Sequence, residues 1–255
     1  MTHIDKDPLE GGFNTNFFQT DIKGNLVLSR VPKPNRDLFE NILYEFRAIG
    51  FTADGGRVQR RSIEEQVHFA NSAASKGLPV LPFFKSGEQW SMPYLENIVP
   101  IDEYLRSADV ADQEKNMAVF DLLTGLERAH RQNIIYGDRW SGNMIVDNGK
   151  VMHIDFDLEL SGDYAREADL AQTLYHLIWA DASRATLPLI IGVVSKLGNY
   201  DIHKTLHYLE GFSQFFTDTP VGGVGETVTQ VVDAITIQKQ SRSKGAIIIG
   251  NGTHL

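Results

Sequence analysis

The sequence predicts an α+β protein of two lobes, one rich in strands and one mainly helical. Through most of the first hundred residues, short apolar runs are bounded by Gly and Pro, which is typical of strands. The pattern changes after Pro100, and from Glu167 onward it is helical almost throughout. We therefore expect residues 1–96 to form the N-terminal lobe and residues 97–255 the C-terminal lobe.

The N-terminal lobe is predicted to begin with a β-hairpin over residues 10–31. Its turn lies near Gly24-Asn25, and Pro32 ends the second strand because it has no N–H to donate. Residues 36–49 predict a helix, since four apolar residues recur at helical spacing: Leu38, Ile42, Phe46 and Ile49.

A second helix is predicted to begin after Ser62, which can cap it with Glu65 in a capping box. The basic cluster at residues 57–61 is expected to be a solvated approach to this helix. Gly77 and the following Pro79 end it. Two more strands are predicted in this lobe, over 80–84 and 89–95.

The C-terminal lobe is predicted to begin with a long helix over Ala111 to Gln132. Two short strands, 144–147 and 151–155, flank a turn at Asn148-Gly149. Four helices are expected after them, over 167–180, 185–197, 201–216 and 223–240. The tail from Ser241 is expected to be loose.

Composition excludes several classes of protein. The net charge of −9 argues against sequence-independent nucleic-acid binding, which needs Lys and Arg on phosphates. There is no Cys, so thiolate metal sites and disulfides are excluded. We see no signal peptide, and the longest apolar run, Leu187 to Val194, is too short to span a bilayer. We expect a cytoplasmic protein with no membrane partner; its oligomeric state is left open.

One segment carries a chemical signature. Asp138 and Asn143 lie five residues apart, and after an apolar strand Asp155 precedes a Phe. A kinase-type phosphotransferase needs such a set: one carboxylate to accept the proton of the attacking hydroxyl, and two oxygen ligands for magnesium. We therefore assign Asp138 as the catalytic base and Asn143 and Asp155 as metal ligands.

The same segment resembles the aminoglycoside phosphotransferase superfamily. Residues 137–143, Gly-Asp-Arg-Trp-Ser-Gly-Asn, are similar to the Gly-Asp-Leu-Trp-Ser-Gly-Asn string of fructosamine kinases. Residues 166–171 are similar to their Arg-Glu-Ala-Asp-Leu stretch, and residues 126–130 to the superfamily's Leu-x-x-Leu-His. The resemblance implies a protein-kinase-like fold that uses ATP and Mg2+. It also implies that Asp169 caps a helix and holds the catalytic loop.

The resemblance extends more weakly to the N-terminal lobe. Residues 11–17 resemble the Gly-Gly-x-x-Asn hairpin of choline and fructosamine kinases, which makes Gly11, Gly12 and Asn14 candidate phosphate-binding residues. Arg30 stands where the family has its phosphate-binding lysine, a departure that is not neutral, because a guanidinium is bulkier and geometrically fixed.

Two further cofactor contacts are implied. Glu65, with Glu64 as the alternative, is expected to pair with Arg30. Residues 90–96 are similar to the family's hinge, and Leu95 is expected to meet the adenine, because Pro93 has no N–H to offer.

We interpret the chain as an ATP-dependent phosphotransferase that acts on a hydroxyl of a small molecule, such as an amino sugar, a fructosamine-like compound or a choline-like compound. One alternative is an atypical protein serine/threonine kinase, although only about eleven residues separate Asp155 from Arg166. A further alternative is a pseudokinase that serves as an interaction module, which Arg30 keeps open.

Overall fold

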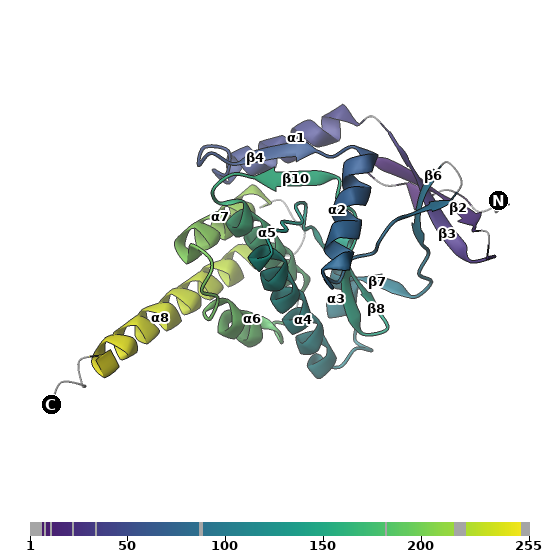
Figure 1. Ribbon diagram of the computed structural model, residues 1–255. Helices are drawn as coiled ribbons and strands as arrows, with labels where there is room; N and C mark the ends of the chain where they lie inside the picture. Colours follow the sequence, from purple (N-terminus) through teal and green to yellow (C-terminus); the bar gives the residue numbers. More distant parts are fainter. Residues whose placement is uncertain are drawn as a thin grey trace.

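The computed structural model describes residues 7, 9–10, 12–21, 23–33, 35–86, 89–181, 183–216 and 223–250. An antiparallel sheet forms one end of the molecule, and helices form most of the rest (Figure 1).

The sheet has five strands in the order β1-β2-β3-β6-β5. Their bounds are β1 Leu9–Glu10, β2 Asn14–Thr20, β3 Leu26–Pro32, β5 Phe84–Ser86 and β6 Gln89–Pro93. The predicted hairpin is confirmed: β2 and β3 pair antiparallel, with Asn16 opposite Arg30. Gly24 has a φ of +84°, a value that glycine adopts without strain. The register places Arg30 on the strand that lies next to β6.

Helix α2, Ile63–Ser75, begins with the predicted capping box. The Ser62 hydroxyl accepts from the Glu65 N–H, and the Glu65 carboxylate accepts from the Ser62 N–H at 2.7 Å. The Glu65 carboxylate therefore caps the N-terminus of α2.

Helix α1, Arg36–Ala48, packs against the C-terminal helices although it precedes the second half of the sheet in sequence. The ring of Phe46 lies 5.6 Å from that of Phe51 and 6.0 Å from that of Phe212 in α7. A side chain at Gly211 would come within 2.9 Å of Ile49, so the two helices approach closely. In space, α1 thus lies with the helices of the second lobe.

The basic cluster forms a strand, and its predicted role as a solvated helix approach is wrong. Strand β4, Arg57–Arg60, pairs antiparallel with β10, Leu158–Ser161. Val58 is buried in this ribbon opposite Leu160. The partner strand lies about a hundred residues away, so no local pattern could reveal the pairing.

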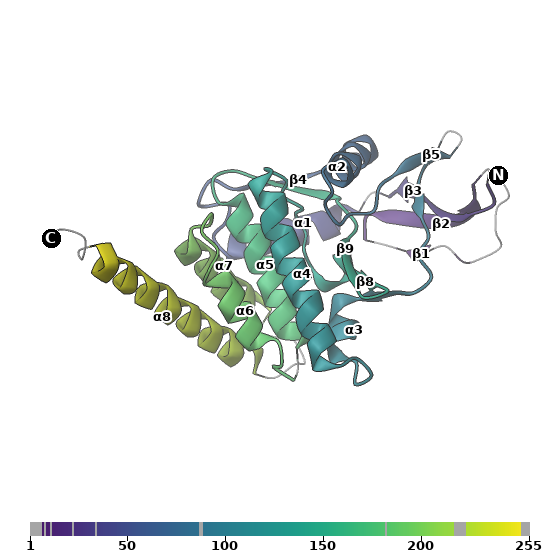
Figure 2. The same cartoon turned by 60° about the horizontal axis from the view of Figure 1, so that its bottom comes forward.

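The remaining elements build the second lobe around α4 and α5. The predicted long helix is confirmed, and the later helices follow the expected order (Figure 2). Their bounds are α3 Ile101–Arg106, α4 Asp112–Arg131, α5 Ala165–Ala180, α6 Leu187–Val194, α7 Ile202–Phe215 and α8 Val224–Gly250. A small sheet holds β7 Ile98–Pro100, β8 Met144–Asp147 and β9 Lys150–His153.

Helix α8 runs further than expected. It continues to Gly250, so the expected loose tail from Ser241 is helical over that range, and the helix extends away from the body of the molecule (Figure 1). Among the described residues, no helix combines the length and the apolar character that crossing a membrane requires.

Candidate active site

The structure brings Asp138 and Asn143 into direct contact. The Asn143 Nδ2 donates to the Asp138 carbonyl at 2.9 Å and lies 3.3 Å from its carboxylate. A 3-10 turn, η1, Ser141–Asn143, closes this five-residue spacing. Asp138 has a φ of +47°, a strained value for a residue with a side chain. The loop is therefore held in a conformation that turns Asp138 into the adjoining cavity, which it lines.

The surroundings of Asp138 suit a proton acceptor near neutral pH. Burial raises its pKa to about 6; Arg139 opposes the rise and the Asp155 carboxylate adds to it. A general base works best when its pKa lies near the operating pH.

Asp155 lies against the same turn. The Ile154 N–H donates to the Asn143 carbonyl at 3.1 Å, and Asp155 has a φ of +55°. Burial opposes the ionisation of Asp155, but the Arg30 guanidinium, 2.9 Å away, holds its pKa below the ordinary value. It is therefore an ionised carboxylate on the wall of the cavity.

The donor set suits magnesium. The Asn143 amide nitrogen donates to Asp138, so the Asn143 amide oxygen points away from Asp138. This oxygen accepts no hydrogen bond from the described residues. Asp155 supplies the second oxygen. In the part of the chain that the structure describes, no three His, Cys, Asp or Glu residues are grouped to hold a metal ion. Magnesium, which takes few protein ligands beside phosphates and water, fits such a site better than zinc does.

Arg139 is a buried residue that holds the loop together, and sequence reasoning assigned no role to it. It is fully buried, and its guanidinium donates to the carbonyls of Gly137 at 2.6 Å, Asn143 at 3.2 Å and Asp155 at 2.8 Å. One side chain thus joins the three segments that carry the predicted chemistry.

Asp169 holds the loop from the other side, as predicted, but it caps no helix. It lies in the second turn of α5, not at its N-cap. Its carboxylate accepts from the N–H groups of Tyr136 and Gly137 at 3.1 and 3.0 Å and pairs with His130 at 2.8 Å. These contacts give Asp169 a structural role.

The predicted pair between Arg30 and Glu65 is not formed, and Gln66 takes the place of Glu65. The Arg30 guanidinium donates to Gln66 Oε1 at 3.1 Å, while the Glu65 carboxylate caps α2. Glu64 lines a different cavity. The reason is helical geometry: successive residues are rotated by about 100° around the helix axis, so Gln66 is directed toward Arg30 and Glu65 is not.

Asn14, in the predicted hairpin, contacts a further carboxylate, that of Asp157. The Asn14 Nδ2 donates to both oxygens of Asp157 at 2.9 Å, and its own Oδ1 is buried without a partner in the described residues. Burial and the neighbouring Asp155 raise the pKa of Asp157 to about 8. Gly12 lines the cavity, and a side chain there would meet Leu38 at 2.6 Å. Gly11 lies outside the described residues.

Leu95, which is predicted to contact adenine at the hinge, lies between the two parts of the protein. Leu95 follows β6 and precedes β7, in the connection between the five-stranded sheet and the small sheet of the second lobe. It is half-buried. The structure shows its place, and its role toward adenine remains a prediction.

Several of these residues line a cavity of about 440 Å³. Asp138, Asp155 and Asp157 line one part of it. Gly12 also lines it, and the remaining residues are ones that sequence reasoning missed or left unassigned: Phe13, Leu38, Ile42, Glu45, Trp140, Gln172, His176 and Phe216. Glu45 had no signal in the sequence, because only the packing of α1 on α7 brings it here.

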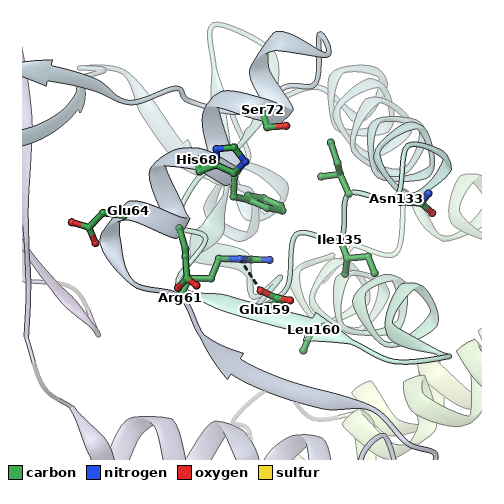
Figure 3. Close-up of a pocket in the computed structure, with 11 residues that line it drawn as sticks. Arg61, Glu64, His68, Ser72, Asn133, Ile135, Glu159 and Leu160 are labelled. Carbon is green, nitrogen blue, oxygen red and sulfur yellow. Dashed lines mark ion pairs between the residues drawn. The ribbon is translucent and has the colours of Figure 1, made fainter.

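A second cavity, of about 520 Å³, lies between α2, residues 133–135 and β10 (Figure 3). Arg61 and Glu159 both line it and form an ion pair, with a nitrogen–oxygen distance of 3.7 Å (Figure 3). None of Asp138, Asn143 and Asp155 lines this cavity, so it is separate from the candidate active site.

Comparison with known proteins shows the fold. No family model and no curated protein matched the sequence. The structure is similar to the Rio2 kinase–ADP/Mg2+–phosphoaspartate complex from Chaetomium thermophilum, with 13% identity and a TM-score of 0.50, over 94% of this chain and 72% of that chain. A second Rio2 kinase structure from the same organism gives 12% identity and a TM-score of 0.49, over 94% and 73%.

The chain therefore has a protein-kinase-like fold, an α+β arrangement with a sheet at its N-terminal end and a helical C-terminal part, as the sequence predicted. The resemblance to fructosamine and choline kinases is not confirmed by these comparisons. At this level of identity the likeness concerns the fold alone.

Proposed function

We propose that this protein transfers the γ-phosphate of ATP, with Mg2+, to a hydroxyl of a small molecule. The observation that carries the proposal is the convergence of Asp138, Asn143 and Asp155 beside a cavity of about 440 Å³. Ligand pockets for small molecules are typically about 300–1,000 Å³.

Each residue would have a defined task. Asp138 would orient the acceptor hydroxyl and take its proton. Asn143 and Asp155 would hold magnesium, whose charge offsets the negative charge of the phosphates during transfer. Arg30, now paired with Asp155, would also bind phosphate oxygens, supported by Gln66 in place of Glu65.

The hairpin and the hinge would hold the nucleotide. Gly12, with Gly11 before it, would let backbone amides approach the phosphates. Asn14 would act through Asp157, which it binds at 2.9 Å. The backbone of Leu95 would contact adenine.

An atypical protein kinase is the second candidate, and the comparisons favour it over a small-molecule kinase, because the similar structure with a TM-score of 0.50 is a Rio2 kinase in an ADP/Mg2+ complex. The geometry favours a small acceptor. The segment after Asp155 is short, and part of it is bound as β10 to β4, which leaves little chain to support a peptide.

One experiment separates these acceptors. The protein is incubated with Mg2+ and γ-labelled ATP, in one arm with a panel of amino sugars, sugars and amino alcohols, and in the other with mixed proteins. The proposal predicts label in small molecules, and none with Asp138→Ala. Label in proteins alone would support the protein kinase, and no transfer in either arm would contradict both and leave the interaction module.

A further inference from the structure

Glu45 is a carboxylate of the cavity that the proposed transfer does not use. It comes from α1, which reaches the site because Phe46, the next residue, is buried against Phe51 and Phe212. Glu45 thus has a fixed place on the cavity wall, with Asp138, although the two residues are far apart in sequence.

Gln172 connects Glu45 to the catalytic loop through two hydrogen bonds. Its Oε1 accepts from the Arg139 N–H at 2.6 Å, which directs its Nε2 toward Glu45, where it donates at 3.3 Å. Only one Glu45 oxygen is engaged in this way. Within the described residues the other, Oε2, has no hydrogen-bond partner and is available to a ligand.

The acidic side chains of the cavity point to the kind of ligand. Its lining contains the carboxylates of Glu45, Asp138, Asp155 and Asp157, and none of the described residues that line it is Lys or Arg. Arg30 offsets Asp155, at 2.9 Å, and approaches Asp157, at 3.9 Å. Glu45 has no such cation, since its one hydrogen-bond partner in the described residues is a neutral amide.

We infer that Glu45 determines acceptor specificity by binding a cationic nitrogen of the acceptor, which places the neighbouring hydroxyl at Asp138. This rests on the proposed small-molecule transfer and adds a recognition residue to it. A carboxylate that is poorly solvated gains more from a cation than one in water does.

The rest of the lining fits this assignment. Trp140, Ile42 and Phe216 supply apolar surface for the carbon skeleton of a ligand, and aromatic rings also attract a cationic nitrogen. His176 has a ring nitrogen, Nδ1, that is buried and has no hydrogen-bond partner among the residues that the structure describes. Burial lowers its pKa to about 3, so it brings no competing positive charge.

The state of Glu45 supports the same assignment. Burial, with a further contribution from Asp138, raises its pKa to about 8. These surroundings therefore disfavour the ionised carboxylate, and a cationic nitrogen bound beside it would favour it.

The test compares acceptors that differ in charge at one position: choline with 3,3-dimethylbutan-1-ol, and glucosamine with glucose. ADP release with saturating Mg-ATP gives kcat/KM for each. We expect the wild type to prefer the cationic member of at least one pair by about tenfold or more, equivalent to about 1.4 kcal/mol. Glu45→Gln should remove that preference. Glu40→Gln, an exposed change on the same helix, should keep it.

The inference is overturned if the wild type shows no preference in either pair, or if Glu45→Gln keeps the same preference. Failure of the proposed transfer is a different result, namely no labelled product with any acceptor. In that case calorimetric binding of the same four compounds decides: the same preference, lost in Glu45→Gln, supports the role of Glu45, and its absence refutes it.

Discussion

Replacing Glu45 by Gln should stabilise the protein, and the gain should grow with pH. The native pKa of Glu45 is raised from the ordinary 4.5 to about 8 by burial and by Asp138. Between these values the native state holds a proton that the unfolded state has released, so native stability falls as the pH rises through this window. Gln has nearly the same shape and no charge, so Glu45→Gln avoids this loss of native stability at high pH.

The magnitude follows from about 1.36 kcal/mol per pH unit. The stability difference between Glu45→Gln and wild type should be near zero at pH 4.5 and reach at most about 2 kcal/mol at pH 6 and about 5 kcal/mol at pH 9. Urea unfolding followed by circular dichroism at several pH values measures it. Glu40→Gln, exposed on the same helix, is the control and should show no such trend. A Glu45→Gln difference that stays constant or decreases toward pH 9 would refute the reasoning.

Three further changes test the scaffold and the site. Asp169→Asn should destabilise the protein by about 2–4 kcal/mol in urea unfolding, because the buried carboxylate that accepts hydrogen bonds from the N–H groups of residues 136 and 137 loses its charge. A change below about 0.5 kcal/mol would contradict that role. Phe46→Ala should cost about 3–5 kcal/mol through a cavity, whereas Tyr44→Ala, 63% exposed, should cost about 1 or less. Equal costs would show that α1 does not pack as described. Arg30→Met should weaken Mg-ATP binding about tenfold or more in calorimetry, since the phosphate oxygens lose the cation proposed to bind them. Unchanged affinity would remove Arg30 from the nucleotide site.

Local sequence patterns predicted the elements that local interactions determine. The hairpin, the capping box at Ser62 and the long helix of the second lobe all follow from spacing within a few residues. The spacing of Asp138 and Asn143 likewise predicted a contact that a single turn creates.

Long-range packing could not be predicted in the same way. Strand β4 exists because β10 lies beside it, and Glu45 lines the cavity because α1 packs on α7. The partner of Arg30 was missed by one residue, since sequence counting does not fix which face of α2 meets the sheet. Arg139 was not assigned, because a buried Arg gives the same local signal as a charged loop residue.

The central claim is that Asn143 and Asp155 form a magnesium–nucleotide site beside Asp138. Isothermal titration of ATP, with and without Mg2+, against wild type and Asp155→Asn tests it most directly. The account predicts that Mg2+ strengthens ATP binding to wild type and that Asp155→Asn loses most of this gain, about tenfold or more. Equal affinity with and without Mg2+ in both proteins would contradict it.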